Sequence, residues 1–91
     1  MKDKNGLYYY PNLENKNIRM YVREHDGSVQ FRLWNKDYPM IWKKHGWVDH
    51  EAIVSASKMY KEQGKTADPM ALYDINMAKR LIRDEKKGAS G

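Results

Sequence analysis

The segment Ile18–Asn35, IRMYVREHDGSVQFRLWN, predicts the fold of this chain more directly than any other stretch. Two runs of alternating apolar and polar residues flank Asp26-Gly27, and this dipeptide between two such runs is a strong signal for a two-residue β-turn. Such a turn fixes the register of the hairpin. The predicted cross-strand pairs are Glu24–Val29, Arg23–Gln30, Val22–Phe31, Tyr21–Arg32, Met20–Leu33 and Arg19–Trp34. One face of the hairpin is then apolar, and the other is basic and aromatic.

A third strand is expected before the hairpin. Gly6–Tyr10 alternates in the manner of a strand, and Pro11-Asn12 ends it. A polar loop, Asn12–Asn17, leads into the hairpin. Three consecutive strands predict an antiparallel meander, in which one face stays solvated while the other packs on helices.

Two helices are expected to follow the sheet. Asp37 is placed to cap a short helix with Pro39 in its first turn, and Gly46 is placed to end it. Asp49 is placed to cap a second helix that ends at Gly64. Val48 and Ile53 hold the two hydrophobic positions that pack together across its start. Helical spacing predicts one buried stripe on this second helix: Ala52, Ile53, Ala56, Met59 and Tyr60.

A third helix is predicted over Pro69–Lys86, starting after Asp68. At about 100° per residue it carries two apolar stripes. The first stripe is Ala71, Leu72, Ile75, Ala78 and Ile82. The second is Met70, Tyr73, Met77 and Leu81. Because a helix on a sheet needs one such stripe, the second predicts an interface with a protein partner or a second copy of the chain. The alternative is that Met and Tyr tolerate partial exposure.

Length and composition limit the classes of protein. The chain has 91 residues, a formal net charge of +5 and no cysteine. We expect a single α+β domain over residues 1–87 and a disordered tail over 88–91. Disulfides and thiolate metal sites are excluded. No apolar run approaches the length of a membrane span, and no signal segment follows the polar N-terminus, so a cytoplasmic location without membrane association is expected.

The basic and aromatic face of the hairpin is the main candidate site. Its predicted members are Arg19, Tyr21, Arg23, Arg32 and Trp34, and Tyr8 or Tyr10 is expected to adjoin them. Cations neutralise phosphates and flat rings stack on bases, so this combination favours nucleic-acid binding. Two alternatives stay open. The same cross-strand pairs also stabilise an exposed sheet, and a helix could cover this face.

The other residue patterns give weaker indications of a functional site. His25, His45 and His50 are too scattered to suggest a metal site, and no cofactor motif occurs. No recognised catalytic motif is present, so we expect no enzyme. The ring-rich segment Trp42–Trp47 predicts a core corner with both indoles between helix and sheet. The alternative is a pocket walled by tryptophan with His45 at its mouth.

The sequence therefore predicts an α+β fold, with a three-stranded antiparallel meander followed by a short helix and two longer helices on one face. This order is similar in outline to small sheet-reading DNA-binding modules, such as the arm-binding domain of some phage integrases. The tryptophan-rich turn and the third helix depart from that outline. The expected function is a non-enzymatic binding module, with nucleic acid favoured as the partner. The alternative is protein–protein interaction or homodimerisation through the C-terminal helix.

Overall fold

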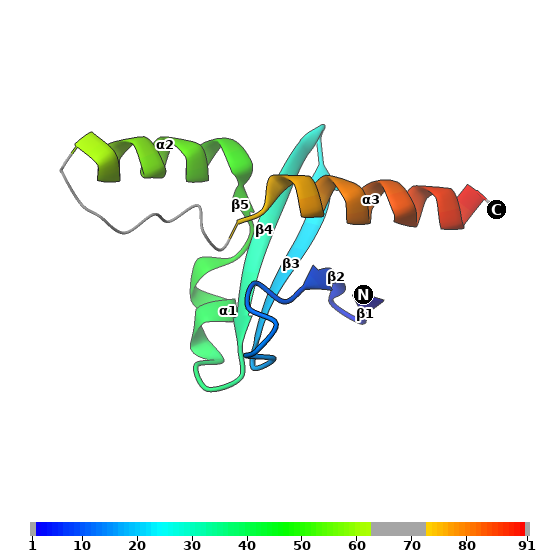
Figure 1. The fold of residues 1–91 in the computed structure, drawn as a ribbon, viewed down its shortest axis with the longest axis horizontal. Coiled ribbons are helices and arrows are strands. Elements are labelled where there is room, and N and C mark those ends of the chain that lie inside the picture. Colours follow the sequence, from blue (N-terminus) through cyan, green and yellow to red (C-terminus); the bar gives the residue numbers. More distant parts are fainter. Residues whose placement is uncertain (1, 63–72, 91) are drawn as a thin grey trace.

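The computed structural model describes residues 2–62 and 73–90 of the chain. Within these ranges the fold is α+β, with an antiparallel sheet in the order β1-β2-β3-β4-β5 and three helices (Figure 1). The elements are β1 (Lys2–Asp3), β2 (Gly6–Tyr9), β3 (Ile18–His25), β4 (Ser28–Asn35), α1 (Met40–His45), β5 (Val48–Asp49), α2 (His50–Glu62) and α3 (Ile75–Ser90).

The predicted hairpin is confirmed, with its register. Asp26 and Gly27 have φ values of 51° and 79°. Positive φ at both central residues is the requirement of a type I′ turn, whose twist matches that of the flanking strands. All six predicted cross-strand pairs occur, and the pairing continues from His25–Ser28 at the turn to Ile18–Asn35 at the far end.

The sheet is wider than predicted, with five strands in place of three. The additional strands, β1 and β5, contain two residues each. Lys2 pairs with Leu7 on β2, and Val48 pairs with Phe31 on β4. Because alternation needs at least four residues to be recognised, such strands leave no periodic signal in the sequence. They form where a neighbouring strand offers unpaired backbone groups.

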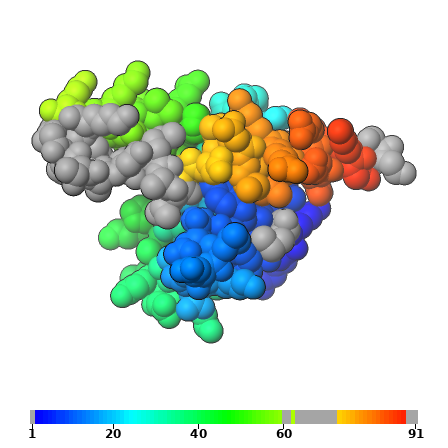
Figure 2. Space-filling view, in the orientation of Figure 1, coloured from blue at the N-terminus to red at the C-terminus, as the bar shows by residue number. Residues whose placement is uncertain are grey.

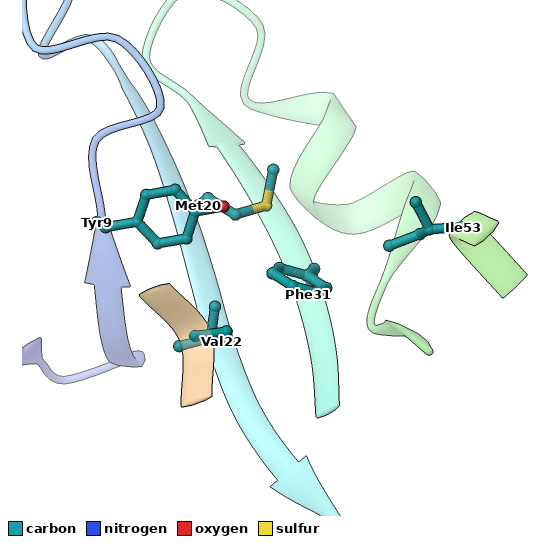
Figure 3. Packing of buried hydrophobic residues seen from close by; sticks show 6 residues of the cluster. Tyr9, Met20, Val22, Phe31 and Ile53 are labelled. Atoms are coloured by element: carbon teal, nitrogen blue, oxygen red, sulfur yellow. The ribbon is translucent and has the colours of Figure 1, made fainter. Parts of the chain in front are cut away.

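The core lies between the apolar face of the sheet and α3. Met20, Val22, Phe31 and Ala78 are fully buried, and Ile53 of α2 closes one end of the cluster (Figure 3). The α3 helix contacts β2, β3 and β4, and its C-terminal end extends past the sheet (Figures 1 and 2). The helix that covers the core is therefore α3. The opposite face of the sheet is not covered by α3 and is contacted by other elements.

The buried stripe predicted for α2 is largely wrong. Ile53 is buried, whereas Ala52, Ala56 and Met59 are exposed. The side chain of Tyr60 and the predicted helix end at Gly64 lie outside the described residues. The reason is geometric, because α2 contacts β4 and β5 near its start and then projects away from the sheet (Figure 1).

The third helix begins later than predicted. Its cap is Asp74, whose carboxylate Oδ1 accepts the backbone N–H of Met77 at 3.0 Å. Tyr73 and Asp74 are not helical, and the predicted start at Asp68-Pro69 lies outside the described residues, as do Met70, Ala71 and Leu72. At the other end, α3 continues to Ser90, although a tail was predicted from residue 88.

The short helix α1 begins and lies differently from the prediction. Pro39 precedes it, no side chain caps it, and the backbone N–H of Asp37 instead donates to Asn35 Oδ1 at 2.9 Å. The predicted end at Gly46 is confirmed, with a φ of 59°. α1 lies beside β4 (Figure 1). It directs Trp42 to the outer face of the sheet, so this helix does not pack wholly on the apolar face.

Candidate functional site

The candidate site is the outer face, defined here as the sheet face opposite α3. Strand alternation places the predicted residues on it together: Arg19, Tyr21 and Arg23 from β3, and Arg32 and Trp34 from β4. Tyr8 of β2 pairs with Tyr21, so it joins them, and the ring of Tyr10 packs against that of Tyr8. The residues predicted from the sequence therefore lie together on one face of the sheet, but Tyr21 is buried and is not part of the accessible surface.

A chain of aromatic rings crosses the outer face. Successive ring centroids lie 5.7 Å apart for Tyr10–Tyr8, 5.3 Å for Tyr8–Tyr21, 5.1 Å for Tyr21–Trp42 and 6.4 Å for Trp42–Trp47. Tyr21 is only 1% exposed, and the other four are half-buried. These separations fall in the range in which aromatic pairs attract beyond their buried area. The row therefore holds α1 and the segment before β5 against the sheet.

Trp42 and Trp47 are members of this site that sequence reasoning missed. The prediction of a corner between helix and sheet is correct for Trp42, but the sheet face is the outer one. Trp47 directly precedes the inward-facing Val48 of β5, so alternation directs it outward. That signal was present in the sequence, but it could be read only once residues 48 and 49 were known to be a strand.

Each arginine of the outer face is stacked on a ring. The guanidinium of Arg32 lies 3.8 Å from the centroid of Trp42, and that of Arg23 lies 4.4 Å from the centroid of Trp47. Arg19 lies between two rings, 4.9 Å from Tyr8 and 4.7 Å from Trp34. A guanidinium stacked in this way loses little conformational freedom when its edge forms further hydrogen bonds.

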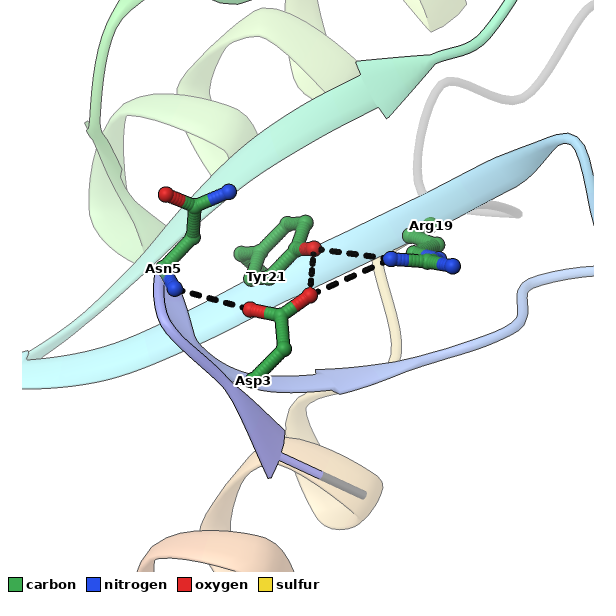
Figure 4. A network of polar contacts seen from close by, with 4 residues as sticks. All are labelled: Asp3, Asn5, Arg19 and Tyr21. Carbon is green, nitrogen blue, oxygen red and sulfur yellow. Dashed lines mark hydrogen bonds and ion pairs between the residues drawn. The ribbon is translucent and has the colours of Figure 1, made fainter.

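Arg19 belongs to a polar network that fastens the N-terminal strand to the sheet (Figure 4). The carboxylate of Asp3 accepts hydrogen bonds from the hydroxyl of Tyr21 and from Arg19 Nη1, the latter at 3.1 Å. Its other oxygen accepts the backbone N–H of Asn5 at 2.8 Å. The charge of Arg19 is therefore already paired with the Asp3 carboxylate within the fold.

The network shifts two pKa values in opposite directions. Partial desolvation opposes the change at Asp3, but the hydrogen bonds from Tyr21 and the Asn5 backbone and the charge of Arg19 together lower its pKa. Burial raises the pKa of Tyr21, and its hydrogen bond to the Asp3 carboxylate raises it further. Both shifts favour an ionised Asp3 beside a neutral Tyr21, so the network is stable at neutral pH.

Arg23 and Arg32 differ from Arg19 in their partners. Arg23 Nε donates to Gln30 Oε1 at 2.7 Å, and the Gln30 amide in turn donates to Asp49 at 2.7 Å. Arg32 donates through Nε and Nη2 to the backbone carbonyl of Trp42. Among the described residues no carboxylate lies within 4.0 Å of either guanidinium. Their charges are therefore not neutralised by an ion pair within the part of the chain that the structure describes.

The predicted interface on the third helix is not a single stripe. Tyr73 lies before α3 and packs edge-on against Phe31 at 5.4 Å between centroids. Leu81 is half-buried against the core, and Met77 is 38% exposed. Met70 lies outside the described residues. Two of the four predicted residues thus serve the core of this chain, and Met77 remains as a surface residue.

The three histidines lie on different elements of the fold. His25 lies at the hairpin turn, His45 at the end of α1 and His50 at the start of α2. Within residues 2–62 and 73–90, no group of three or more His, Asp or Glu residues is arranged to hold a metal ion. A pocket beside His45 is lined by Phe31, Leu33, Ile41, Gly46, Val48 and Tyr73. It therefore opens on the apolar side of the sheet, and neither tryptophan forms its wall.

Comparisons with known proteins add no relative. No known protein family, curated protein or solved structure matches this chain. Within the described part of the chain, the helices are all too short or too polar to cross a bilayer. The geometry of the outer face is therefore the basis on which a function can be proposed.

Proposed function

We propose that this protein is a small, non-enzymatic binding module that holds nucleic acid against the outer face of its sheet. The observation that carries the proposal is the surroundings of the Arg23 and Arg32 side chains. Both arginine residues are half-buried, each guanidinium lies over a tryptophan ring, and neither has a carboxylate partner among the described residues. Phosphate groups are the natural ligands of such fixed guanidinium groups, because two N–H donors match two phosphate oxygens.

The charge of the whole chain supports the same partner. A formal net charge of +5 attracts a polyanion from a distance and accelerates its encounter. The acids of the outer face oppose this attraction only in part, since Asp3 is paired with Arg19, although Asp49 is hydrogen-bonded to the neutral amide of Gln30 and keeps its charge. The rings around the arginines supply the apolar contact that a purely electrostatic surface lacks.

The test is a binding titration with charge-matched variants. A fluorescently labelled oligonucleotide of mixed sequence is titrated at about 50 mM salt, where phosphate contacts are strong. The double variant Arg23→Gln/Arg32→Gln removes two charges from the outer face. The control, Lys58→Gln/Lys79→Gln, removes two charges from exposed positions on α2 and α3. We expect at least a tenfold loss of affinity for the first and less than a threefold loss for the second.

The salt dependence supplies a second readout. Each lost phosphate contact lowers the slope of log affinity against log salt by about 0.7 for a single strand. The outer-face variant should therefore lower the slope by about 1.4. Because Arg32 also bonds to the backbone of α1, Arg23→Gln alone is measured beside the double variant, with circular dichroism as the check on folding. Absence of binding by the wild type, or an equal loss in the control, would overturn the proposal.

The alternative proposal is protein binding or homodimerisation through α3. It rests on Met77, a large apolar side chain exposed on the helix that covers the core. A two-fold dimer is the commonest closed arrangement of identical chains. Sedimentation of the wild type at increasing concentration tests it, because a dimer of this kind dissociates on dilution.

A further inference from the structure

The width of the outer face limits which nucleic acid it can contact. At one level all five strands lie side by side, because Lys2, Leu7, Val22, Phe31 and Val48 are paired in succession across the sheet. Neighbouring strands lie about 4.8 Å apart, so the backbone is about 19 Å wide at this level. The major groove of B-form DNA is about 12 Å wide and admits a helix or a two-stranded ribbon. The outer face is therefore too wide to enter it.

One part of the sheet is narrow enough for a groove, but its charge is unsuitable. Toward the turn, β3 and β4 extend past the other strands as a two-stranded ribbon from Glu24 and Val29 to Asp26 and Gly27. The side chain of Asp26 is 90% exposed, whereas Glu24 is ion-paired with Lys86 of α3 at 3.0 Å. An exposed carboxylate at the tip of a ribbon repels the phosphates that line a groove. The hairpin tip is therefore a poor reader of duplex DNA.

The rings of the outer face are suited to bases that are not already stacked. Trp34 is half-buried, Arg19 lies over it, and it has no ring–ring contact within the described residues. Tyr10 lies at the opposite side of Arg19 and meets Tyr8 edge-on. A duplex keeps the flat faces of its bases inside its own stack, whereas a single strand can turn them toward the protein.

From the width, the tip charge and the rings together, we infer that the outer face takes single-stranded nucleic acid, with unpaired bases stacked on Trp34 and Tyr10 and phosphates against Arg23 and Arg32. This inference rests on the proposed function and specifies its partner. Stacking on a flat ring tolerates any base, so binding should depend little on sequence. The sugar is not specified by these contacts, so DNA and RNA strands share the recognised chemistry.

The experiment compares three probes of the same sequence and of about 12 nucleotides, a length within the usual site size of single-strand binders. They are a DNA strand, an RNA strand and the corresponding DNA duplex, each titrated by fluorescence anisotropy at about 50 mM salt. We expect one or both single strands to bind at least tenfold more tightly than the duplex. The relative affinity of the DNA and RNA strands shows which of them is preferred.

Variants of Trp34 separate stacking from charge. Trp34→Leu removes the aromatic ring while it keeps a large apolar side chain, and Trp34→Phe keeps a ring. We expect Trp34→Leu to weaken single-strand binding about tenfold and leave duplex binding unchanged, because one stacked base is lost. Trp34→Phe should stay within about threefold of the wild type. Both variants are checked for folding by urea denaturation.

The outcomes distinguish this inference from the proposed function. Equal binding of strand and duplex, with Trp34→Leu unaffected, would overturn the inference and leave electrostatic nucleic-acid binding in place. Equal weakening by Trp34→Leu and Trp34→Phe would also overturn it, because a ring would then not replace the indole. If none of the three probes binds, the proposed function itself fails.

Discussion

Phe31→Ala is the sharpest test of the fold, because Phe31 lies at the centre of the core and its position depends on the hairpin register. The ring is fully buried and faces Val22 across the hairpin. Val48 of β5 pairs with it on the other side, and Tyr73 packs edge-on against it at 5.4 Å between ring centroids. The substitution removes six ring carbons from this environment and leaves the β-carbon.

The expected loss can be built from its parts. Removing a fully buried aromatic ring forfeits about 2 kcal/mol of transfer free energy. A residual cavity of about 80 Å³ adds about 2 kcal/mol at about 24 cal/mol per Å³. The lost edge-on contact with Tyr73 adds about 0.5–1 kcal/mol. The total is about 4.5–5 kcal/mol, close to the whole free energy of unfolding of a marginal domain of this size.

The assay is urea denaturation followed by tryptophan fluorescence. Because Phe31→Ala can unfold the chain in the absence of urea, Phe31→Leu is measured as well and should cost about 1.5 kcal/mol. Leu13→Ala is the control, since Leu13 is 77% exposed and its truncation should cost less than about 0.5 kcal/mol. A loss below about 1 kcal/mol for Phe31→Ala would refute the reasoning. It would mean that the register is shifted by one residue, because such a shift exchanges the two faces of the hairpin.

Two further predictions concern the Asp3 network and α3. The pKa of Asp3 is lowered from 3.8, so the ionised carboxylate stabilises the fold fully above about pH 3.8. This stabilisation is lost as the pH falls through the lower folded-state pKa. Asp3→Asn should therefore destabilise the fold by about 1 kcal/mol at pH 7, and the difference from the wild type should shrink below about pH 4; a constant difference down to pH 2.5 in urea denaturation would exclude this cause. Met77→Glu should fold normally, whereas Leu81→Glu should cost about 2 kcal/mol or more, because Leu81 packs on the core. Thermal unfolding compares the two variants, and sedimentation of Met77→Glu shows whether any self-association of the wild type is lost; equal stability of the two would place Leu81 outside the core.

The sequence by itself determined the hairpin. Asp26-Gly27 accepts positive φ at both turn positions, and the period of two along each strand leaves one register that puts Val22 and Phe31 on the same side. The five outer-face residues follow from the same alternation. The end of α1 at Gly46 was also readable, because glycine adopts a left-handed backbone without a steric penalty. These features depend on neighbours within a few residues or on a single turn.

The start of α3 was decided by a contact distant in sequence. The backbone N–H of Asp74 donates to the hydroxyl of Tyr9 at 2.8 Å, and Asp74 then caps the helix. Burial raises the pKa of Tyr9 to about 12, so its hydroxyl stays neutral and can accept this bond. Asp68 and Asp74 carry similar capping chemistry in the sequence, so local signals could not locate the helix start at Asp74.

The tertiary structure also decided which further residues join the predicted ones on the outer face. Asp3, Trp42 and Trp47 come from β1, α1 and the residue before β5, and none of them shares a strand with the predicted set. They reach the outer face because β1 and β5 pair with the edges of the central strands and α1 lies beside β4. Two-residue strands have no period of their own, since their stability comes from the backbone of a neighbouring strand. The ion pair between Asp3 and Arg19, which Arg23 and Arg32 lack among the described residues, therefore exists only in the folded chain.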